Sequence, residues 1–282
     1  MKQCYGDISV EQVCRLFGKT RQAWYDVNER QINLQWQEEL VVQWVQEIRE
    51  VLPRTGGLKL YGLLKNKLQL HRIPLGRDGF FNLLRRSDLL IQPRKKYVYT
   101  TQSVHRFKKW PNLVEHINLT SAEQLWVSDI TYLRTATGFI YLFLITDAWS
   151  RKIMGYHLSQ QLKAKGCITA LLKAISARQY PQRALIHHSD RGIQYCCDEY
   201  VALLKEHGII ISMTQTGSPY DNAIAERING ILKQEFSLDI VFRSYSHAIE
   251  PVAKAIHLYN TVRPHFSCQL KTPAQQHFNP YP

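Results

Sequence analysis

The sequence predicts a mixed α/β domain preceded by small, helical modules. The middle of the chain carries apolar, β-branched and aromatic runs at residues 126–133, 139–147 and 152–158, separated by the short connections that antiparallel hairpins use. From about residue 164 onward, helical and strand patterns alternate, which is typical of an α/β sheet. Near the N-terminus, by contrast, the apolar residues recur at helical spacing.

The order of these elements predicts a mixed, five-stranded sheet. After the three-strand meander we expect a helix at about 164–178, a strand at 184–189, a helix at 198–207, a strand at 209–213 and a helix at 221–236. The ribonuclease-H-like arrangement is one fold of this kind. We place this core domain at residues 121–240 and a helical tail at residues 241–282.

A first helical module is expected at residues 1–30. Residues 8–26 have the pattern of two short helices around Gly18, with Thr20 able to cap the second helix, which carries Arg21. This pattern resembles a helix-turn-helix, whose second helix could enter a DNA major groove. Many helical hairpins that bind nothing share the same pattern.

A second helical module is expected at residues 31–92. Its helices are predicted at residues 35–52, 58–70 and 79–87. The Trp and Leu stripe of the first of these helices is better explained as core than as a contact surface. The module is nevertheless a candidate for DNA binding, because its last helix carries Arg85 and Arg86.

Composition indicates a polyanionic partner. The 282 residues include 36 Lys and Arg against 23 Asp and Glu, which gives a formal charge of +13 and a pI near 9.5. Such an excess favours nucleic acid, because binding releases the counterions that are condensed on the phosphates. The plainer alternative, a merely soluble basic protein, does not explain why the charge is clustered.

The charge is clustered in a predicted basic linker at residues 93–120. No acidic residue lies between Asp88 and Glu115. Basic and aromatic side chains alternate in this segment: Arg94, Lys95, Lys96, Tyr97, Tyr99, Arg106, Phe107, Lys108, Lys109 and Trp110. A charge run is usually a solvated surface, but the missing acids and the interleaved rings favour a segment that lies along a phosphate backbone.

Cysteine usage and hydropathy predict an intracellular protein. The six cysteines form no C-x-x-C pair, so neither a zinc ribbon nor a thioredoxin-like site is indicated, and a reduced compartment fits best. No signal peptide is evident, and the longest apolar run, residues 139–145, has the length of a strand. We expect a cytoplasmic, nucleoid-associated location.

Two aspartates of the predicted sheet are candidate metal ligands. Asp129 lies within an apolar strand, where a charge is costly unless it is paired or binds a metal ion. Asp190 follows the next buried strand, at the carboxyl end where α/β sheets place their ligands. Each has an ordinary alternative explanation, as a solvent-facing strand residue or as a turn residue before Gly192.

Glu226 completes the candidate set from the helix at residues 221–236. At about 100° per residue, one side of this helix carries Ile224, Ile228, Ile231 and Leu232. The opposite side carries Asn222, Glu226, Asn229, Gly230 and Lys233. An ordinary amphipathic helix explains this pattern taken alone. With two further carboxylates on strands, the set offers the oxygen ligands that Mg²⁺ requires.

Four motifs, in this order, resemble one family. They are WVSDITYL around Asp129, HHSDRGIQY around Asp190, GSPYDNAIAERINGILKQEF around Glu226, and YNTVRPH followed by TP near the end. They resemble the DDE transposases of the IS-three group of bacterial insertion sequences, in particular the second-reading-frame product, whose core is similar to retroviral integrase. The resemblance spans nearly the whole chain and implies an α/β, ribonuclease-H-like catalytic core.

The resemblance implies metal-dependent cleavage and joining of DNA. It makes Asp129, Asp190 and Glu226 the catalytic residues and the ligands of Mg²⁺ or Mn²⁺, with two ions expected. Activated water would attack a phosphodiester at the end of the element, and the exposed 3′-hydroxyl would then attack a second phosphodiester. Neither step needs a covalent protein intermediate. Members of this kind usually join one end of their element to the other and form a circle.

The resemblance also implies DNA contacts and partners. Lys233 matches the DNA-contacting basic residue of the family. Further candidates for DNA contact or for support of the site are Arg191, Gln194, Tyr220, Asp221 and Asn222, with Arg94, Lys95 and Lys96 of the linker and Arg21 of the first module. The expected partners are the terminal repeats and the target as double-stranded DNA, further copies of the chain in a dimer or larger assembly, and a first-reading-frame partner, separate or fused.

The C-terminal run keeps the anchors of the family but departs between them. The pairs Tyr-Asn and Thr-Pro and the triplet Arg-Pro-His are present within residues 259–273. Between them stand Phe266, Cys268 and Gln269, where a serine- and leucine-rich stretch is more usual. This departure concerns the packing or DNA contacts of the tail and leaves the three acids untouched.

Two other functions fit parts of the sequence. A repressor with a degenerate integrase core would bind DNA through the helical modules without catalysis, but a decayed site has no reason to keep all three acids. A tyrosine recombinase is weakly indicated by His188 and Arg191, which form an H-x-x-R pattern followed by Tyr220. That alternative leaves Asp129 and Glu226 unexplained.

Overall fold

The computed structural model describes residues 9–91, 107–115, 117–215 and 222–278. The chain folds into two compact units, one formed by Met1–Val51 with Thr55–Ile91 and the other by Leu52–Arg54 with Gln92–Pro282. No described helix is long and apolar enough to cross a membrane.

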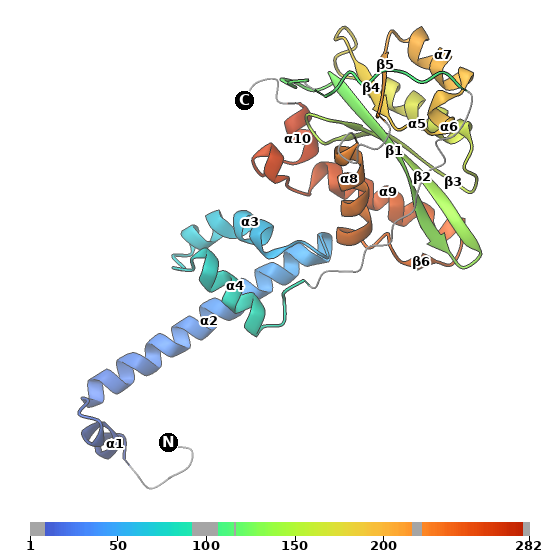
Figure 1. Ribbon diagram of the computed structural model, residues 1–282. Helices are drawn as coiled ribbons and strands as arrows, with labels where there is room; N and C mark the ends of the chain where they lie inside the picture. Colours follow the sequence, from blue (N-terminus) through green and yellow to red (C-terminus); the bar gives the residue numbers. More distant parts are fainter. Residues whose placement is uncertain (1–8, 92–106, 116, 216–221, 279–282) are drawn as a thin grey trace. The chain divides into compact units, whose positions relative to one another are not determined.

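In the residues that the structure describes, the N-terminal unit contains helices and no strand. It consists of α1 (Val10–Leu16), α2 (Arg21–Val51), α3 (Gly57–Leu70) and α4 (Arg77–Arg86) (Figure 1). Ser9 begins α1 with a capping box, in which its hydroxyl accepts from the Gln12 N–H and the Gln12 side chain accepts from the Ser9 N–H. Gly18 makes the turn to α2 with a φ of 61°, which glycine adopts without steric cost.

The structure corrects the prediction of two separate helices between residues 20 and 52. They form one 31-residue helix, α2, which runs through the expected module limit at residue 30. The reason is that residues 21–51 contain neither Gly nor Pro, so nothing in this segment ends a helix once it has begun. The expected turn at Gly18 is present, but the helix that follows it is not short.

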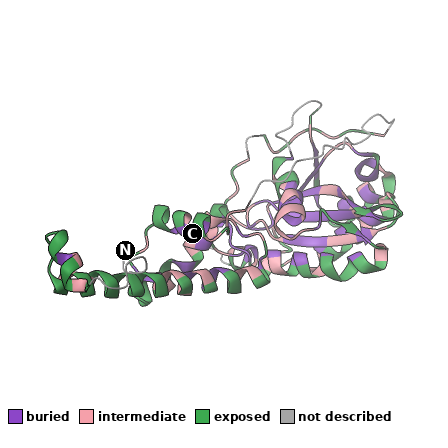
Figure 2. Cartoon of the chain, turned by 90° about the horizontal axis from the view of Figure 1, so that it is seen from below, coloured by how far each residue is buried: buried purple, intermediate pink, exposed green. Residues whose placement is uncertain are grey.

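The second half of α2 belongs to the core of this unit, as its Trp and Leu stripe predicts. The buried side chains of this core come from α2, α3 and α4: Val41, Trp44, Val45, Leu60, Leu64, Leu68, Phe80, Leu83 and Leu84. In the first half of α2, by contrast, Trp24, Ile32 and Trp36 are exposed. Figure 2 shows this change from exposed to buried residues along the helix.

The second unit contains a mixed sheet. Its strands are β1 (Leu125–Thr135), β2 (Gly138–Asp147), β3 (Ile153–Ser159), β4 (Ile186–Ser189), β5 (Ile210–Met213) and β6 (Val241–Phe242). The strand order is β3-β2-β1-β4-β5, with β6 pairing with β1. The first three strands are antiparallel, whereas β4 and β6 run parallel to β1 and β5 runs parallel to β4. The five predicted strands are confirmed, and β6 adds a sixth.

Helices cover both faces of the sheet. They are α5 (Ala164–Ser176), α6 (Ile193–Cys196), α7 (Asp198–Glu206), α8 (Ala223–Glu235), α9 (Tyr245–Thr261) and α10 (Pro273–His277). Strand β2 separates two cores, because Phe143 and Ile145 pack with α5 and α7, whereas Leu142 and Leu144 pack with α8 and α9. The central strand β1 is therefore enclosed by helices (Figure 1), and it carries the first candidate acid.

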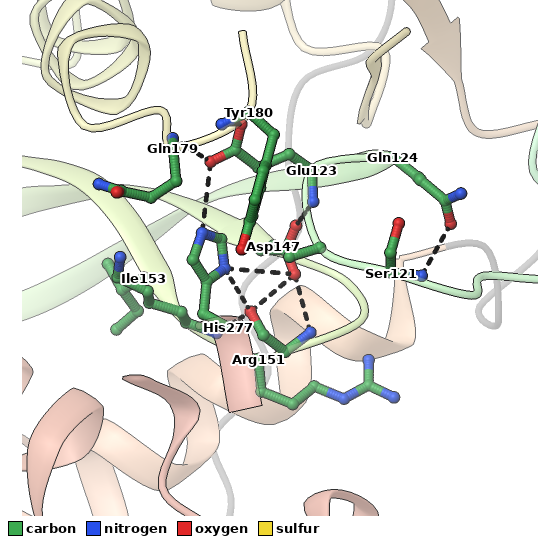
Figure 3. A network of polar contacts seen from close by, with 12 residues as sticks. Ser121, Glu123, Gln124, Asp147, Arg151, Ile153, Gln179, Tyr180 and His277 are labelled. Carbon is green, nitrogen blue, oxygen red and sulfur yellow. Dashed lines mark hydrogen bonds and ion pairs between the residues drawn. The ribbon is translucent and has the colours of Figure 1, made fainter. Parts of the chain in front are cut away.

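A buried polar network fixes the beginning of β1 (Figure 3). The Glu123 carboxylate accepts hydrogen bonds from the backbone N–H groups of Gln179 (2.6 Å) and Tyr180 (3.0 Å) and from Arg178 Nε (3.2 Å). The Glu123 N–H donates to Asp147 Oδ2 over 2.6 Å. Glu123 therefore connects the start of β1 with the end of β2 through its N–H and with the loop between α5 and β4 through its carboxylate.

His277 brings the C-terminal helix α10 into the same network. Its Nε2 lies 3.3 Å from Glu123 Oε1, and its Nδ1 lies 2.9 Å from the hydroxyl of Ser150. Ser150 in turn donates its N–H and its hydroxyl to Asp147 Oδ1, each over 2.7 Å. Figure 3 shows His277 between the two carboxylates. Segments far apart in sequence thus meet at one buried point, since Glu123 and His277 are separated by 154 positions.

Hydrogen bonding lowers the pKa of Glu123. Burial alone would raise this pKa, but the bonds from His277, Gln179, Tyr180 and Arg178 outweigh it and lower the pKa from 4.5 to about 2. A carboxylate with a lowered pKa stabilises the fold above the pKa of the unfolded state. That contribution is lost as the pH falls from about 4.5 through about 2.

We expect Glu123→Gln to lower the free energy of unfolding at pH 7 by roughly 3 kcal/mol, the equivalent of this pKa shift. The difference between wild type and variant should shrink as the pH falls from 5 to about 2, because the wild-type carboxylate becomes protonated in that window. Urea unfolding at several pH values measures it, with the exposed Glu206→Gln as control. Equal stability of wild type and Glu123→Gln at pH 7 would contradict the role of the network.

Candidate functional site

Asp129 lies in β1, partly buried, with a partner at each carboxylate oxygen. Oδ1 accepts the N–H of Ile130 over 2.9 Å, and Oδ2 accepts Nδ2 of Asn229 over 2.6 Å. Burial, followed by the carboxylates of Asp190 and Glu226, raises the pKa of Asp129 from 3.8 to about 7, against the effect of the two hydrogen bonds. The other two candidate acids are therefore close enough to act electrostatically on Asp129.

Asp190 follows β4 at the position that the parallel register sets beside Asp129. Val127 pairs with His188, and two further residues along each strand lead to Asp129 and Asp190. The chain then turns, and the Gly192 N–H donates to Asp190 Oδ1 over 2.9 Å. A Cβ at Gly192 would lie 2.9 Å from the same oxygen, closer than side chains normally come. Glycine at this position therefore leaves room for the Asp190 carboxylate.

Glu226 lies exposed in the first turn of α8, between two buried asparagines. Asn222 Nδ2 donates to the Ser128 carbonyl over 3.0 Å, and Asn229 Nδ2 donates to Asp129. The sequence placed both amides on an open polar face, and this expectation is corrected. Only 8% of Asn222 and 6% of Asn229 is exposed, because this part of the helix packs on β1. The buried isoleucine side, with Ile228 and Ile231, is confirmed.

The three candidate carboxylates lie near one another but are not arranged as the ligands of a single metal ion. Among the residues that the structure describes, no group of three His, Cys, Asp or Glu side chains is placed to hold one ion. The oxygens Oδ1 of Asn222 and Oδ1 of Asn229 are buried and have no hydrogen-bond partner in the described part of the chain. Carboxylate and amide oxygens are ligands of the kind that hard divalent cations prefer.

Lys233 lies on α8 two turns beyond Glu226 and is half-buried. Burial lowers its pKa, while Asp129 and Asp239 act to raise it and Arg134 acts to lower it. Asp129 therefore acts electrostatically on Lys233, whose role as a DNA contact stays a prediction. Arg134, an exposed residue of β1, is a further cation near Lys233 that the sequence did not single out.

The remaining sequence candidates differ in position. Arg191 is partly buried next to Asp190, and Gln194 is buried in α6. Arg21 begins α2 in the other unit, is exposed, and donates to the Tyr25 hydroxyl over 3.5 Å. The other candidates lie outside the described residues: Arg94, Lys95, Lys96, Tyr220 and Asp221.

Both histidines of β4 are core residues. The hydroxyls of Ser128 and Tyr200 lie 2.6 Å and 2.9 Å from Nε2 of His187, and burial lowers the pKa of His187 to about 3. His188 is fully buried with its Nδ1 2.8 Å from the Ser212 hydroxyl. The histidine of the H-x-x-R pattern, His188, is therefore explained by its place in the core.

The C-terminal motifs hold α8 and β3 in place. Arg263 is buried and binds Glu235 of α8 through two hydrogen bonds, Nε to Oε2 (2.8 Å) and Nη2 to Oε1 (2.7 Å). Asn260 accepts the N–H of Ile153 and donates to the carbonyl of the same residue, each over 2.9 Å. Thr272 caps α10. The role of these motifs could not be predicted from the sequence, because their partners are remote in the chain.

Comparison with known proteins defines the class and then the family. The family described as Integrase core domain matches residues 120–219, and a second family of the same description matches residues 207–273. The second unit of the chain therefore contains an integrase core. It belongs to the transposases of IS3-type insertion sequences, because relatives of this kind match it over most of their length.

Three relatives illustrate the family. The Insertion element IS600 uncharacterized 31 kDa protein of Shigella sonnei is 30% identical over 257 residues, covering 90% of this chain and 93% of the relative. Transposase InsF for insertion sequence IS3A of Escherichia coli (strain K12) is 30% identical, covering 81% and 80%. The transposase for insertion sequence element IS904 of Lactococcus lactis subsp. lactis (strain IL1403) is 36% identical, covering 58% and 65%.

Solved integrase structures are also similar to the chain. The HTLV-2 integrase catalytic core domain in complex with magnesium (trimeric form) is 21% identical, with a TM-score of 0.45, and the match covers 56% of this chain and 97% of that one. A simian T-cell lymphotropic virus intasome in complex with PP2A regulatory subunit B56 gamma gives 18% identity and a TM-score of 0.49, covering 79% and 75%.

We expect Arg263→Ala to lower the free energy of unfolding by roughly 3 kcal/mol, because it leaves the Glu235 carboxylate without its buried partner. Arg263→Lys should be destabilised less than Arg263→Ala, because lysine keeps the positive charge. It should still be less stable than wild type, because lysine cannot form the two parallel hydrogen bonds of the guanidinium. Chemical unfolding measures both variants beside the exposed Arg243→Ala. If Arg263→Ala kept its stability and lost only DNA affinity, the motif would be a DNA contact instead.

Proposed function

We propose that this transposase cleaves DNA at the ends of its insertion sequence and joins the ends to DNA, with Asp129, Asp190 and Glu226 as the catalytic and metal-binding residues. The observation that carries the proposal is the hydrogen bond of Asn229 to Asp129, which joins α8, the helix of Glu226, to the strand whose parallel pairing with β4 leads to Asp190. Burial and the carboxylates of Asp190 and Glu226 also raise the pKa of Asp129 to about 7. A site of this composition is disfavoured without a cation.

Mg²⁺ or Mn²⁺, with two ions, fits these residues best. Both ions prefer oxygen ligands, which Asp129, Asp190 and Glu226 would supply. When bound, the ions supply charge neutralisation at the scissile phosphate and a lowered pKa of the attacking hydroxyl group. Glu226 is exposed on α8, so its flexible side chain is free to turn toward the two aspartates.

The chain itself contributes cations that hold the phosphates. We assign this role to Lys233, on which Asp129 acts electrostatically, and to Arg191, which follows Asp190 in the sequence, and add Arg134 of β1. Asn222 was expected to contact DNA, but it is buried and its amide binds Ser128, so we propose that it positions α8 instead.

Further DNA contacts are proposed outside the catalytic core. Arg21 in the N-terminal unit and the basic linker with Arg94, Lys95 and Lys96 carry the excess charge that binds terminal repeats and target as double-stranded DNA. Tyr220 shortly precedes α8 in the sequence and is a DNA-contact candidate because it stands beside the site motif around Glu226.

Two DNA ends must be held together during transposition, so we propose a dimer or larger assembly. A first-reading-frame partner, separate or fused to this chain, is part of the same proposal. We place the protein in the cytoplasm, associated with the nucleoid, where its DNA substrate lies.

Glu226→Gln should lower strand transfer roughly a hundredfold or more while DNA affinity stays within a few-fold, because it removes a metal ligand and keeps the shape of the helix. The assay uses labelled end oligonucleotides with Mg²⁺ or Mn²⁺, and electrophoretic shifts measure binding. Exposed Glu206→Gln is the matched control.

Other outcomes would replace the proposal. Full activity of Glu226→Gln would remove this residue from the site. A wild-type protein that binds the ends and never cuts them, with either ion, would be a repressor. A covalent DNA adduct that disappears in Tyr220→Phe would identify a tyrosine recombinase.

A further inference from the structure

One amide contacts the Asp129 carboxylate directly. Asn229 Nδ2 donates to Asp129 Oδ2 over 2.6 Å, and the Ile130 N–H donates to Oδ1 over 2.9 Å. Both oxygens therefore have a fixed donor, which sets the plane of the carboxylate. Asn229 is itself buried in α8, with 6% of its surface exposed.

The same residue links Asp129 to the placement of Glu226. Asn229 follows Glu226 by three positions and therefore lies on the same side of α8. Asn222, four positions before Glu226, donates to the Ser128 carbonyl over 3.0 Å. The helix is thus attached to two consecutive residues of β1, one on each side of the Glu226 turn.

The chemistry of an amide suits this position. A neutral donor orients a carboxylate without cancelling its charge, whereas Lys or Arg in its place would compete with a cation for the same oxygens. The amide orientation is also determined, because the reverse orientation would bring two oxygens together. Oδ1 of Asn229 then remains buried with no hydrogen-bond partner in the described part of the chain, and it is an acceptor for a water or hydroxyl group.

We propose that Asn229 is a positioning residue for the divalent cation: it orients the Asp129 carboxylate and holds Glu226 beside it. This inference rests on the proposed function, which assigns the cation to the acids. Residues that hydrogen-bond to metal ligands typically change metal affinity by about 10–100-fold when they are replaced. A residue that only supports the fold away from the acids would change stability and leave metal affinity unchanged.

Asn260 provides the control, because its amide docks α9 on β3 through the backbone groups of Ile153 and contacts no carboxylate. The experiment compares full-length wild type, Asn229→Leu, which keeps the branched shape of the side chain, Asn229→Ala and Asn260→Ala. Calorimetric titration gives the Mn²⁺ dissociation constant without DNA, and thermal unfolding gives Tm. Rates of strand transfer measured at increasing Mn²⁺ concentrations give the half-saturating Mn²⁺ concentration and the maximal rate as two separate values.

Both Asn229 variants should bind Mn²⁺ about tenfold or more weakly and need correspondingly more Mn²⁺ for half-maximal strand transfer. Asn260→Ala should lower Tm and retain Mn²⁺ affinity within about threefold. An active wild type whose Asn229→Leu and Asn229→Ala variants bind Mn²⁺ normally would overturn this inference alone. A wild type with neither Mn²⁺ binding nor strand transfer would overturn the proposed function and this inference together.

Discussion

The attachment of α8 to β1 is the contact on which the site depends. Two buried asparagine amides bind adjacent residues of the strand, one at the Ser128 carbonyl and one at the Asp129 carboxylate. Glu226 lies between them on the helix. The parallel pairing of β4 with β1 leads to Asp190 at the same end of the sheet, and the helix contact brings α8, which carries Glu226, to the strand of Asp129.

Parts of the chain far from the acids keep this contact in place. At the end of α8, Arg263 binds Glu235 through two hydrogen bonds and so ties the helix to the C-terminal motifs. At the beginning of β1, Glu123 receives hydrogen bonds from a loop, while His277 brings in the last helix. The tail is therefore part of the catalytic core as a structure, and its motifs need no DNA contact to explain them.

Much of this arrangement could be predicted from the sequence. Strands were evident as β-branched and aromatic runs, and helical periodicity placed Glu226 and Lys233 on one face of α8. Helical periodicity shows which residues share a face of a helix but not what that face packs against. The packing of Asn229 on Asp129 therefore could not be predicted. Strand β6 has two residues and is too short to show a period. The buried position of Glu123 depends on partners scattered over 154 positions, which no local pattern reveals.

The account requires that Asp129, Asp190 and Glu226 meet at a divalent cation. The most direct test is a crystal structure of the protein soaked with Mn²⁺, with the ion located by its anomalous scattering. We predict Mn²⁺ bound by the carboxylates of both aspartates, with the Glu226 side chain turned toward it and Asn229 still bonded to Asp129. Saturating Mn²⁺ that leaves these three carboxylates without an anomalous peak, or binds elsewhere, would contradict the account.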